Sequence, residues 1–439
     1  MNGYFKIVLF GLLLYVNLSY GSINNLLIDG GEKILIFAPH PDDEVLGCAG
    51  VIQKAIKSNA NVYIVYLTNG DHNQIPYRFY EKKLVLKPSA YIELGEIRRK
   101  ESTKATGMLG IPSKNLIFLG YPDFGTLKIW ENYWKNNEKP FMSFLTRATK
   151  VPYKENYSFG KPYISESILG DIKQIINDIR PSKIFITSNY DTNVDHRALY
   201  NFVRVALLDM ENKPDVFIYL VHFKGHPQKN SQELLLPDIF SNFYLYKLSL
   251  EDNEIQNKMT AIQCFKSQVP DEFFISKKHW MFSFTRGNEI FYKEDDISLE
   301  REIKLESERE AEFESYINKS YPFYILLTKS GEFLNIEFIH RKRILVPTGY
   351  IFYFFPYKYG IEFSKMPKNI INLTKEKEVV TSEDNKYVQE LKYERLKNKI
   401  SFRIKLSDLN YPDYLFFSSS IKTGGITYDF IPWEVIKIK

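Results

Sequence analysis

The strongest constraint on the fold is an alternation of continuous apolar runs with segments of helical periodicity. The apolar run at residues 34–38 precedes a helical pattern at 45–60, and a second apolar run covers 62–68. Apolar runs of this kind are typical of strands that are buried on both faces. The alternation therefore predicts an α/β fold, with a Rossmann-like, mostly parallel sheet and helices on both faces.

The same alternation continues to about residue 265. Further strands are expected at 116–120, 183–188 and 216–221, and further helices at 96–110, 165–180, 195–210 and 254–265. A glycine at 110 and a proline at 181 end two of these helical patterns, as helix stop signals do. We expect a first domain over residues 22–295.

The amino terminus has the order of an export signal. Lys6 is followed by an apolar run over residues 7–18 and then by small residues. This run is shorter than the roughly 20 apolar residues of a membrane-spanning helix. We expect residues 1–21 to be a signal peptide, with an uncleaved anchor as the alternative. The mature protein would then be periplasmic, extracellular or at the cell surface, with no stable membrane span.

Composition and pattern change after residue 295. Residues 296–318 are highly charged and are expected to form a helical linker. From 319 to 439 the apolar runs are short, β-branched and aromatic, which predicts an all-β, sandwich-like accessory domain. Its aromatic residues, dense between Tyr350 and Tyr359 and including Trp433, would either fill the core or form stacking surfaces for carbohydrate.

The sequence FAPHPDDEVLGCAG places His40, Asp42, Asp43 and Glu44 at the end of the first predicted strand. Ligands of α/β sheets bind at the carboxyl ends of the strands. Acidic residues there can cap the following helix, but capping does not require a histidine. His40 and Asp43 can converge on one cation around a tight turn, which leaves another acid free to act as a base.

A third metal ligand is expected after another predicted strand. In the sequence SNYDTNVDHRALY, His196 follows the strand at 183–188 and begins a helix. It therefore lies at the same edge of the sheet as His40 and Asp43, and three protein ligands with an open position for water are typical of catalytic zinc. Asp191 is a candidate partner for the His196 imidazole or, alternatively, a capping residue.

These two sequences resemble the signatures of a known family. APHPDDEVLGCAG is similar to the first signature of the zinc-dependent N-acetylglucosaminyl deacetylases of the PIG-L/LmbE family, and DTNVDHRA resembles the second. Weaker similarities are TNGD, RRKESTKATGMLG, FLGYPDFG, KSQ and RGNEIF. The resemblance covers about residues 31–294.

The resemblance implies a metal-dependent amidohydrolase that acts on linear amides. Zn²⁺ would be held by His40, Asp43 and His196, and water activated by the metal would attack an N-acetyl group with Asp42 as general base. The implied substrate is an N-acetylglucosamine-type unit of a glycan or glycoconjugate.

The resemblance also implies that Arg98 and Asp123 contact the sugar. Each has a plain alternative. Arg98 would form a helix-surface ion pair with Glu101, and Asp123 would be a turn former.

One position departs from the family pattern. Asn193 stands where the family commonly has the first His of His-x-x-His, which helps to stabilise the oxyanion or serves as an acid. Asn can donate a hydrogen bond but cannot transfer a proton, so the enzyme would be slowed rather than inactive. His222 and His226 follow another predicted strand and are candidates to compensate, with His222 as a substrate-binding residue.

Three functions compete on this sequence. The leading interpretation is an exported zinc deacetylase of glycans. The alternative is a metal-containing glycan-binding protein that the Asn193 replacement has weakened or silenced. A nucleotide-dependent enzyme is disfavoured because the first loop lacks a glycine-rich phosphate-binding turn. Nucleic acid is not expected as a partner, since the net charge of +5 is spread along the chain.

Overall fold

The structure is a computed structural model that describes residues 23–439 apart from 73–86, 135–138, 229–230, 270–278, 310–322, 342–348, 374–377, 383–392, 397 and 424–425. The expected signal peptide lies outside the described residues. Among the described helices, none combines the length and the apolar character that crossing a bilayer requires.

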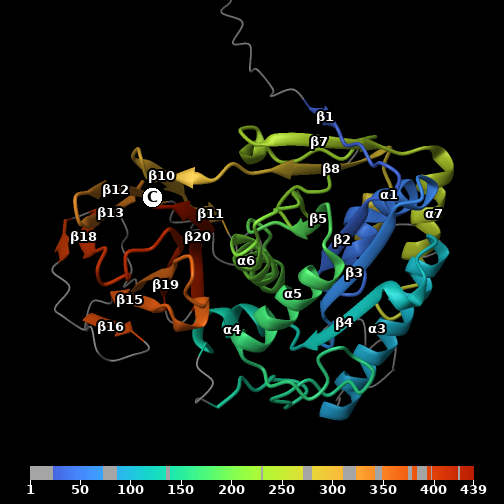
Figure 1. Cartoon of the computed structure of the whole chain (residues 1–439), viewed down its shortest axis with the longest axis horizontal. Coiled ribbons are helices and arrows are strands. Elements are labelled where there is room, and N and C mark those ends of the chain that lie inside the picture. The colour runs from blue at the N-terminus through green and yellow to red at the C-terminus, as the bar shows by residue number, and fades with distance from the viewer. Residues whose placement is uncertain are drawn as a thin grey trace, which may run out of the picture.

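The first unit is built on a sheet that contains, within the described residues, eight strands in the order β1-β7-β8-β6-β5-β2-β3-β4 (Figure 1). These strands are β1 (Asn24–Asn25), β2 (Lys33–Ala38), β3 (Asn61–Thr68), β4 (Leu116–Tyr121), β5 (Lys183–Thr187), β6 (Asp215–Tyr219), β7 (Tyr244–Ser249) and β8 (Asn288–Lys293). Strands β2 to β6 pair in parallel, whereas β8 is antiparallel to β6 and β7. The predicted mostly parallel sheet is confirmed.

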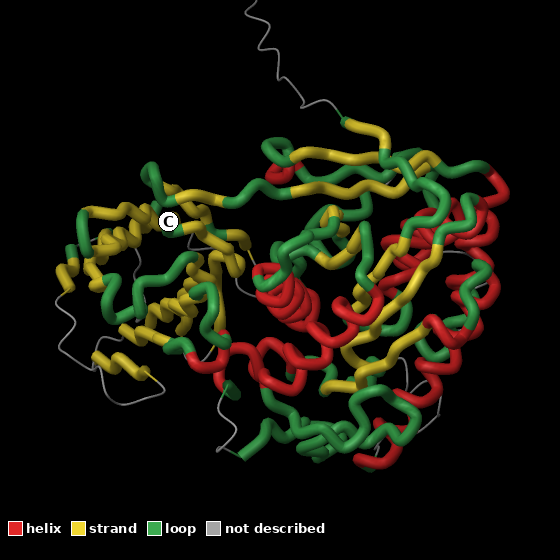
Figure 2. The backbone as a smooth tube through the Cα atoms, viewed as in Figure 1, coloured by secondary structure: helices red, strands yellow, loops and turns green. Residues whose placement is uncertain are grey.

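Helices cover both faces of this sheet, as Figure 2 shows. One face carries α1 (Asp43–Lys57), α3 (Pro88–Met108) and α7 (Asp252–Ile262), and the other α4 (Thr126–Asn132), α5 (Ser165–Ile179) and α6 (Val194–Leu208). The side chains of β2 alternate between the two cores: Leu35 and Phe37 pack toward α5 and α6, and Ile34 and Ile36 toward α1. A strand buried on both faces is apolar throughout, which explains the continuous run in the sequence.

The order of the strands places a topological switch point between β2 and β5. From β2 the chain moves outward through β3 and β4, and it then returns to β5 on the other side of β2 before continuing to β6. At such a topological switch point the connections leave the sheet in opposite directions, and the carboxyl ends of the two central strands open a binding site. His40 follows β2 and His196 follows β5.

The second unit consists of two antiparallel sheets that face each other across a separate core. One sheet has the order β10-β12-β13-β18-β17, and the other β11-β20-β19-β14-β15-β16 with β9 beside β20. Their strands are β9 (Ile297–Ser298), β10 (Ile303–Glu306), β11 (Glu308–Arg309), β12 (Phe323–Ser330), β13 (Phe333–His340), β14 (Gly349–Tyr357), β15 (Asn369–Leu373), β16 (Glu378–Ser382), β17 (Tyr393–Arg395), β18 (Lys399–Lys405), β19 (Tyr414–Thr423) and β20 (Ile426–Lys437). The predicted all-β class of this part is confirmed.

The prediction of a helical linker at 296–318 is wrong where the structure describes it. Residues 297–309 contain β9, β10 and β11, and β10 pairs with β12. In β10 Ile303 and Leu305 are buried while Lys304 and Glu306 are exposed, the two-residue period of a half-buried strand. The charges occupy the outward positions, so the second unit begins at β9 rather than at residue 319. Residues 310–318 lie outside the described residues.

The aromatic residues of β14 and β19 fill cores, whereas Tyr359 after β14 is exposed. On β14, Tyr350, Phe352 and Phe354 point between the two sheets, whereas Tyr353 and Phe355 on its other side join the core of the first unit. Trp433 of β20, 2% exposed, lies with its ring centroid 5.4 Å from that of Trp130 in α4. The interpretation of these rings as core is supported, and the two units share a continuous hydrophobic core.

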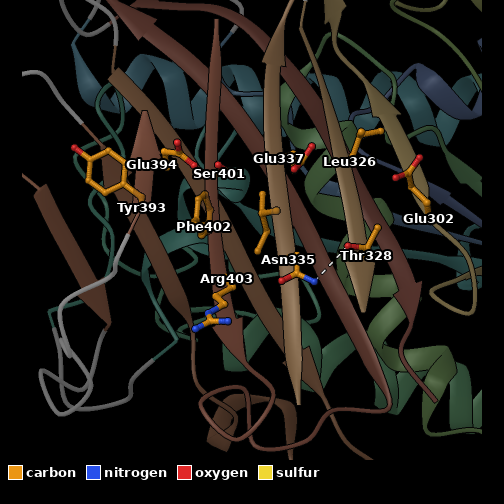
Figure 3. A pocket seen from close by; sticks show the side chains of 11 residues that line it. Glu302, Leu326, Thr328, Asn335, Glu337, Tyr393, Glu394, Ser401, Phe402 and Arg403 are labelled. Carbon is orange, nitrogen blue, oxygen red and sulfur yellow. Dashed lines mark hydrogen bonds between the residues drawn. The ribbon is translucent and has the colours of Figure 1, made fainter. Parts of the chain in front are cut away.

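A groove of about 630 Å³ is hollowed in the outer face of the sheet that contains β12, β13 and β18 (Figure 3). Side chains such as Asn335, Glu337 and Arg403 line it. All of its lining residues belong to the second unit, so it lies apart from the carboxyl edge at which His40 and His196 are found.

Candidate metal centre

The three side chains expected to bind a metal converge at the switch point between β2 and β5. His40 lies in the loop after β2, Asp43 is the first residue of α1, and His196 is in the first turn of α6. Asp43 Oδ2 is 3.1 Å from both His40 Nδ1 and His196 Nε2. One ligand atom from each residue lies within 4.8 Å of the others, and all three residues are buried. The geometry fits the expectation, and their role as ligands stays a prediction.

The donor atoms of this cluster fit a divalent cation. Among the described residues, Asp43 Oδ1 is a buried oxygen without a hydrogen-bond partner. Buried polar atoms are nearly always paired, so orphaned ones indicate a missing partner such as an ion. Two imidazoles and one carboxylate, with room for water, are the donor set of a catalytic zinc site.

Carboxylates stand behind both imidazoles. His196 Nδ1 is 3.0 Å from Asp191 Oδ2, and His40 Nε2 is 3.1 Å from Asp123 Oδ1 and 3.3 Å from Asp195 Oδ2. Carboxylates in this position fix the orientation and tautomer of metal-binding imidazoles. Asp191 therefore lies where the sequence hypothesis requires it. Asp123 faces His40, a contact that the sequence hypothesis did not include.

The electrostatics of the cluster favour an ionised Asp43. Burial acts to raise its pKa, but His196 and His40 hold the pKa of Asp43 well below its usual range. Burial likewise disfavours charge on His196, yet Asp191 and Asp43 raise the pKa of that imidazole to about 9. A metal that binds here would therefore displace a proton from His196.

Asp195 belongs to the site and was missed by the sequence analysis. It is fully buried and accepts hydrogen bonds from Phe124 N at 2.6 Å, from Thr126 N at 3.1 Å and from Thr126 Oγ1. It thereby ties the loop that carries Asp123 to the start of α6. The signal was present, because Asp195 directly precedes His196, but an acid in a first helical turn is typical of a cap.

Asp71 is a second acid that the sequence analysis left without a role. It lies in the loop after β3, where Tyr153 Oη donates to its Oδ2 at 2.5 Å. Burial, and then the charge of Asp123, raise the pKa of Asp71 to about 7. The only signal in the sequence was the similarity of TNGD to the family.

Asp42, the predicted base, is a buried carboxylate with a raised pKa, and its catalytic role stays a prediction. Its side chain makes no cap hydrogen bond to α1. Instead its Oδ2 accepts from Arg98 Nη2 at 2.8 Å. Burial raises the pKa of Asp42 to about 7 although Arg98 opposes the rise. A carboxylate that titrates near neutral pH is suited to accept and return a proton.

Glu44 supports this loop. Its Oε2 accepts from Asp42 N at 2.9 Å and its Oε1 from Ser102 Oγ at 2.5 Å. Burial raises the pKa of Glu44 to about 8, so the group is largely protonated at neutral pH.

Arg98 is a buried partner of the base rather than a surface residue. It is 4% exposed and also donates to Pro41 O and Gly70 O, both at 2.9 Å. Glu101, the alternative partner, accepts instead from the backbone and side chain of Ser267. The ion-pair alternative with Glu101 is wrong, and a sugar contact of Arg98 stays a prediction.

Replacing Arg98 with Met is expected to shift the pH dependence of activity. Without the guanidinium the pKa of Asp42 rises above about 7. Since the base works only when ionised, the acidic limb of the kcat/KM profile moves to higher pH, and a shift of one pKa unit costs about tenfold on that limb. Arg99→Met is the matched control, because Arg99 on the same helix pairs with Glu96 and Glu155. An acidic limb that stays in place would contradict the coupling.

The remaining predicted residues are Asn193 and His222, which lie near His196, and His226, which does not. Asn193 is the N-cap of α6: its Oδ1 accepts from Asp195 N at 2.9 Å, which leaves its NH₂ group as the donor. His222 N donates to Asp191 Oδ2 at 2.9 Å, and the His222 ring lies 5.0 Å from that of His196. His226 lies 3.1 Å from Leu235 O through Nδ1 and adjoins Phe284 rather than the cluster. Substrate contacts of Asn193 and His222 stay predictions.

The sheet and the His40-Asp43-His196 cluster at its switch point define an α/β protein with a candidate metal-binding site. Residues 35–207, from β2 to the end of α6, match the family model PIG-L, described as GlcNAc-PI de-N-acetylase. This part of the chain is a PIG-L family domain, and the family is one of deacetylases. The expected family is thereby confirmed.

Individual relatives are distant. A putative glucosamine-6-phosphate deaminase-like protein of Bacteroides thetaiotaomicron is 23% identical over 199 residues, which cover 42% of this chain and only 28% of that relative. The N,N'-diacetylchitobiose deacetylase of Pyrococcus horikoshii is 21% identical, with a TM-score of 0.35 over 59% of this chain and 82% of that one. The 4-carboxy-2-hydroxymuconate hydratase of Pseudomonas putida is 15% identical, with a TM-score of 0.36 over 58% and 82%.

Proposed function

We propose that this protein is a metal-dependent hydrolase that removes N-acetyl groups from N-acetylglucosamine-type sugars of a glycan or glycoconjugate. One observation carries the proposal. Asp42, a buried carboxylate with a pKa of about 7, adjoins a buried His-Asp-His cluster at the switch point of a PIG-L family domain. A proton acceptor beside a metal-type donor set is what hydrolysis of an unactivated amide requires.

Each side chain of the site has a part in this reaction. A cation such as Zn²⁺, held by His40, Asp43 and His196, would supply a Lewis acid that activates water and polarises the acetyl carbonyl. Asp42 accepts the proton of the attacking water and returns it to the nitrogen of the departing amine, while the ion pair with Arg98 keeps Asp42 ionised.

Residues around the ligands hold their geometry. Asp191 orients His196, and Asp123 and Asp195 orient His40. Asn193 stands where the family commonly has a histidine, and its NH₂ group can donate a hydrogen bond to the acetyl oxyanion. It cannot supply a proton, because an amide does not transfer one. We also propose that the protein acts outside the cytoplasm, on the basis of the apolar segment at residues 7–18.

Acetate release tests the function directly. Zinc-loaded protein is expected to release acetate from N-acetylated chito-oligosaccharides or from a panel of cell-wall glycans. Removal of the metal with a chelator should abolish the release, and added Zn²⁺ should restore it. Stoichiometric metal binding without acetate from any glycan would overturn the proposal and would favour the glycan-binding alternative.

A further inference from the structure

We propose that Phe124 and Trp280 are two stacking surfaces for sugar rings on either side of the candidate metal centre. The substrate would then be an oligosaccharide whose neighbouring units are held while one internal acetyl group is cleaved. This inference rests on the proposed function and names the substrate class: a glycan chain rather than a monosaccharide.

Phe124 is an exposed ring on a strained backbone. It is 54% exposed and has a φ of 57°, in the left-handed region that bulky residues rarely adopt. Its N–H donates to the buried Asp195 Oδ2 at 2.6 Å, and Asp195 in turn lies 3.3 Å from His40 Nε2. Strain of this kind persists only where surrounding groups hold it, and it collects at functional sites. The same acid that orients His40 thus fixes an aromatic ring toward solvent.

The neighbours of Phe124 tie it further to the site. Its ring centroid is 5.0 Å from that of His72, and His72 N donates to Asp123 Oδ2 at 2.9 Å. Asp123 is the carboxylate that faces His40. A ring and a carboxylate in adjacent positions match a pyranose, which has an apolar C–H face and hydroxyl groups at its edge.

Trp280 adjoins the other imidazole. It lies in the 3-10 turn η3 (Trp280–Phe284) and is 43% exposed. Its ring centroid is 5.3 Å from that of His222, which is 5.0 Å from that of His196. A large aromatic side chain that remains in solvent beside an imidazole of a candidate site is typical of a ligand surface.

The sheet places these two rings on opposite sides of the switch point. Phe124 follows β4, whereas His222, against which Trp280 packs, follows β6. In the strand order β6-β5-β2-β3-β4 the two metal-ligand loops after β5 and β2 lie between them. A glycan that contacts both rings would then extend across the edge of the sheet at which the candidate metal ligands lie.

Binding and turnover of a chito-pentasaccharide test this arrangement. Phe124→Leu and Trp280→Leu are each expected to raise the KM for N-acetylated chitopentaose and its Kd in calorimetry about tenfold, with kcat changed less than twofold. The ratio of kcat/KM for pentamer to monomer should fall about tenfold. Phe124→Tyr should restore binding, since it keeps the ring. Tyr359→Leu is the control, because Tyr359 is 53% exposed but lies in the second unit.

The outcomes separate this inference from the proposed function. If both Leu variants bind and hydrolyse the pentamer as the unaltered protein does, the stacking surfaces are wrong while deacetylation stands. If the unaltered protein releases no acetate but binds the pentamer, and the Leu variants weaken that binding, the surfaces stand and the hydrolase does not. Absence of pentamer binding to the unaltered protein, or equal weakening by Tyr359→Leu, overturns the inference.

Discussion

Replacement of Asp42 with Asn is expected to lower kcat for acetate release by roughly 10²–10⁴-fold, the usual contribution of a positioned general base. The amide keeps the size of the carboxylate and an oxygen that can accept from Arg98, so the loop should retain its shape. What it loses is the ability to take a proton from water at neutral pH. Initial rates of acetate release, together with zinc content by mass spectrometry, check the result.

Glu44→Gln is the matched control for this substitution. Glu44 is the next acid along the loop, and burial raises its pKa to about 8. At pH 7 Glu44 is largely neutral already, so Gln preserves its charge. The amide oxygen can still accept from Asp42 N, and the NH₂ group can donate to Ser102 Oγ, which reverses one hydrogen bond. We expect kcat to change only a few-fold. Unchanged turnover in Asp42→Asn would show that another group is the base, and loss of zinc would show that Asp42 holds the metal.

The positions of the candidate metal ligands could be predicted from the sequence because these residues follow strands whose apolar pattern is clear. β2 and β5 are continuous apolar runs, so the positions of His40 and His196 at their carboxyl ends followed from the α/β rule alone. The family resemblance then supplied the role of Asp42. None of this required knowledge of the loops between the strands.

The rest of the site depends on contacts between distant loops. Asp71 and Asp123 follow β3 and β4, and only the folded sheet brings Asp123 to His40 and Asp71 near Asp123. In the sequence an isolated acid in such a loop is indistinguishable from a turn former or a cap. The alternative partner of Arg98 was wrong for the same reason: helical spacing suggests Glu101, whereas burial of the helix face directs Arg98 to Asp42.

The charged composition of residues 296–309 led to the wrong prediction of a helix. Many Lys and Glu residues with few glycines favour a solvated helix. Each strand there is short, and its pairing partner, β12 or β20, lies far along the chain. The alternation of Ile303 and Leu305 with charged residues covers only four positions, too few to decide against helix before the partner strands are known.

A buried ion pair that contacts the backbone of α1 was also not predicted from the sequence. Lys258 Nζ donates to Leu46 O at 2.7 Å and to Glu289 Oε1 at 2.8 Å, and Glu289 accepts from Gly50 N and Val51 N. Leu46 O and Gly50 N are also the acceptor and the donor of one i→i−4 position within the continuous helix α1. Lys258 thus donates to the acceptor of this helical position and Glu289 accepts from its donor. The helix is α1, which begins with Asp43.

Lys258→Met is expected to lower the free energy of unfolding by about 3–5 kcal/mol, because it leaves the Glu289 carboxylate buried and uncompensated. Lys258 is 0% and Glu289 1% exposed. The double variant Lys258→Met with Glu289→Gln carries no buried charge and should recover part of that loss. Lys57→Met is the matched control: Lys57 on α1 pairs with Glu251 at the start of α7, but both side chains are more than half exposed, so its loss should cost about 0–1 kcal/mol. Urea unfolding of the unaltered protein and of the three variants, all without metal, measures these free energies.

The same variants test whether the pair acts on the metal centre. Asp43 is less than two turns from Leu46 and Gly50, so a change in the path of α1 would move its carboxylate relative to His40 and His196. We therefore expect Lys258→Met to weaken zinc affinity in a chelator competition, whereas Lys57→Met should not. A loss of stability equal to that of Lys57→Met would contradict the buried pair. A large loss with unchanged zinc affinity would mean that the loop after β2 alone fixes Asp43.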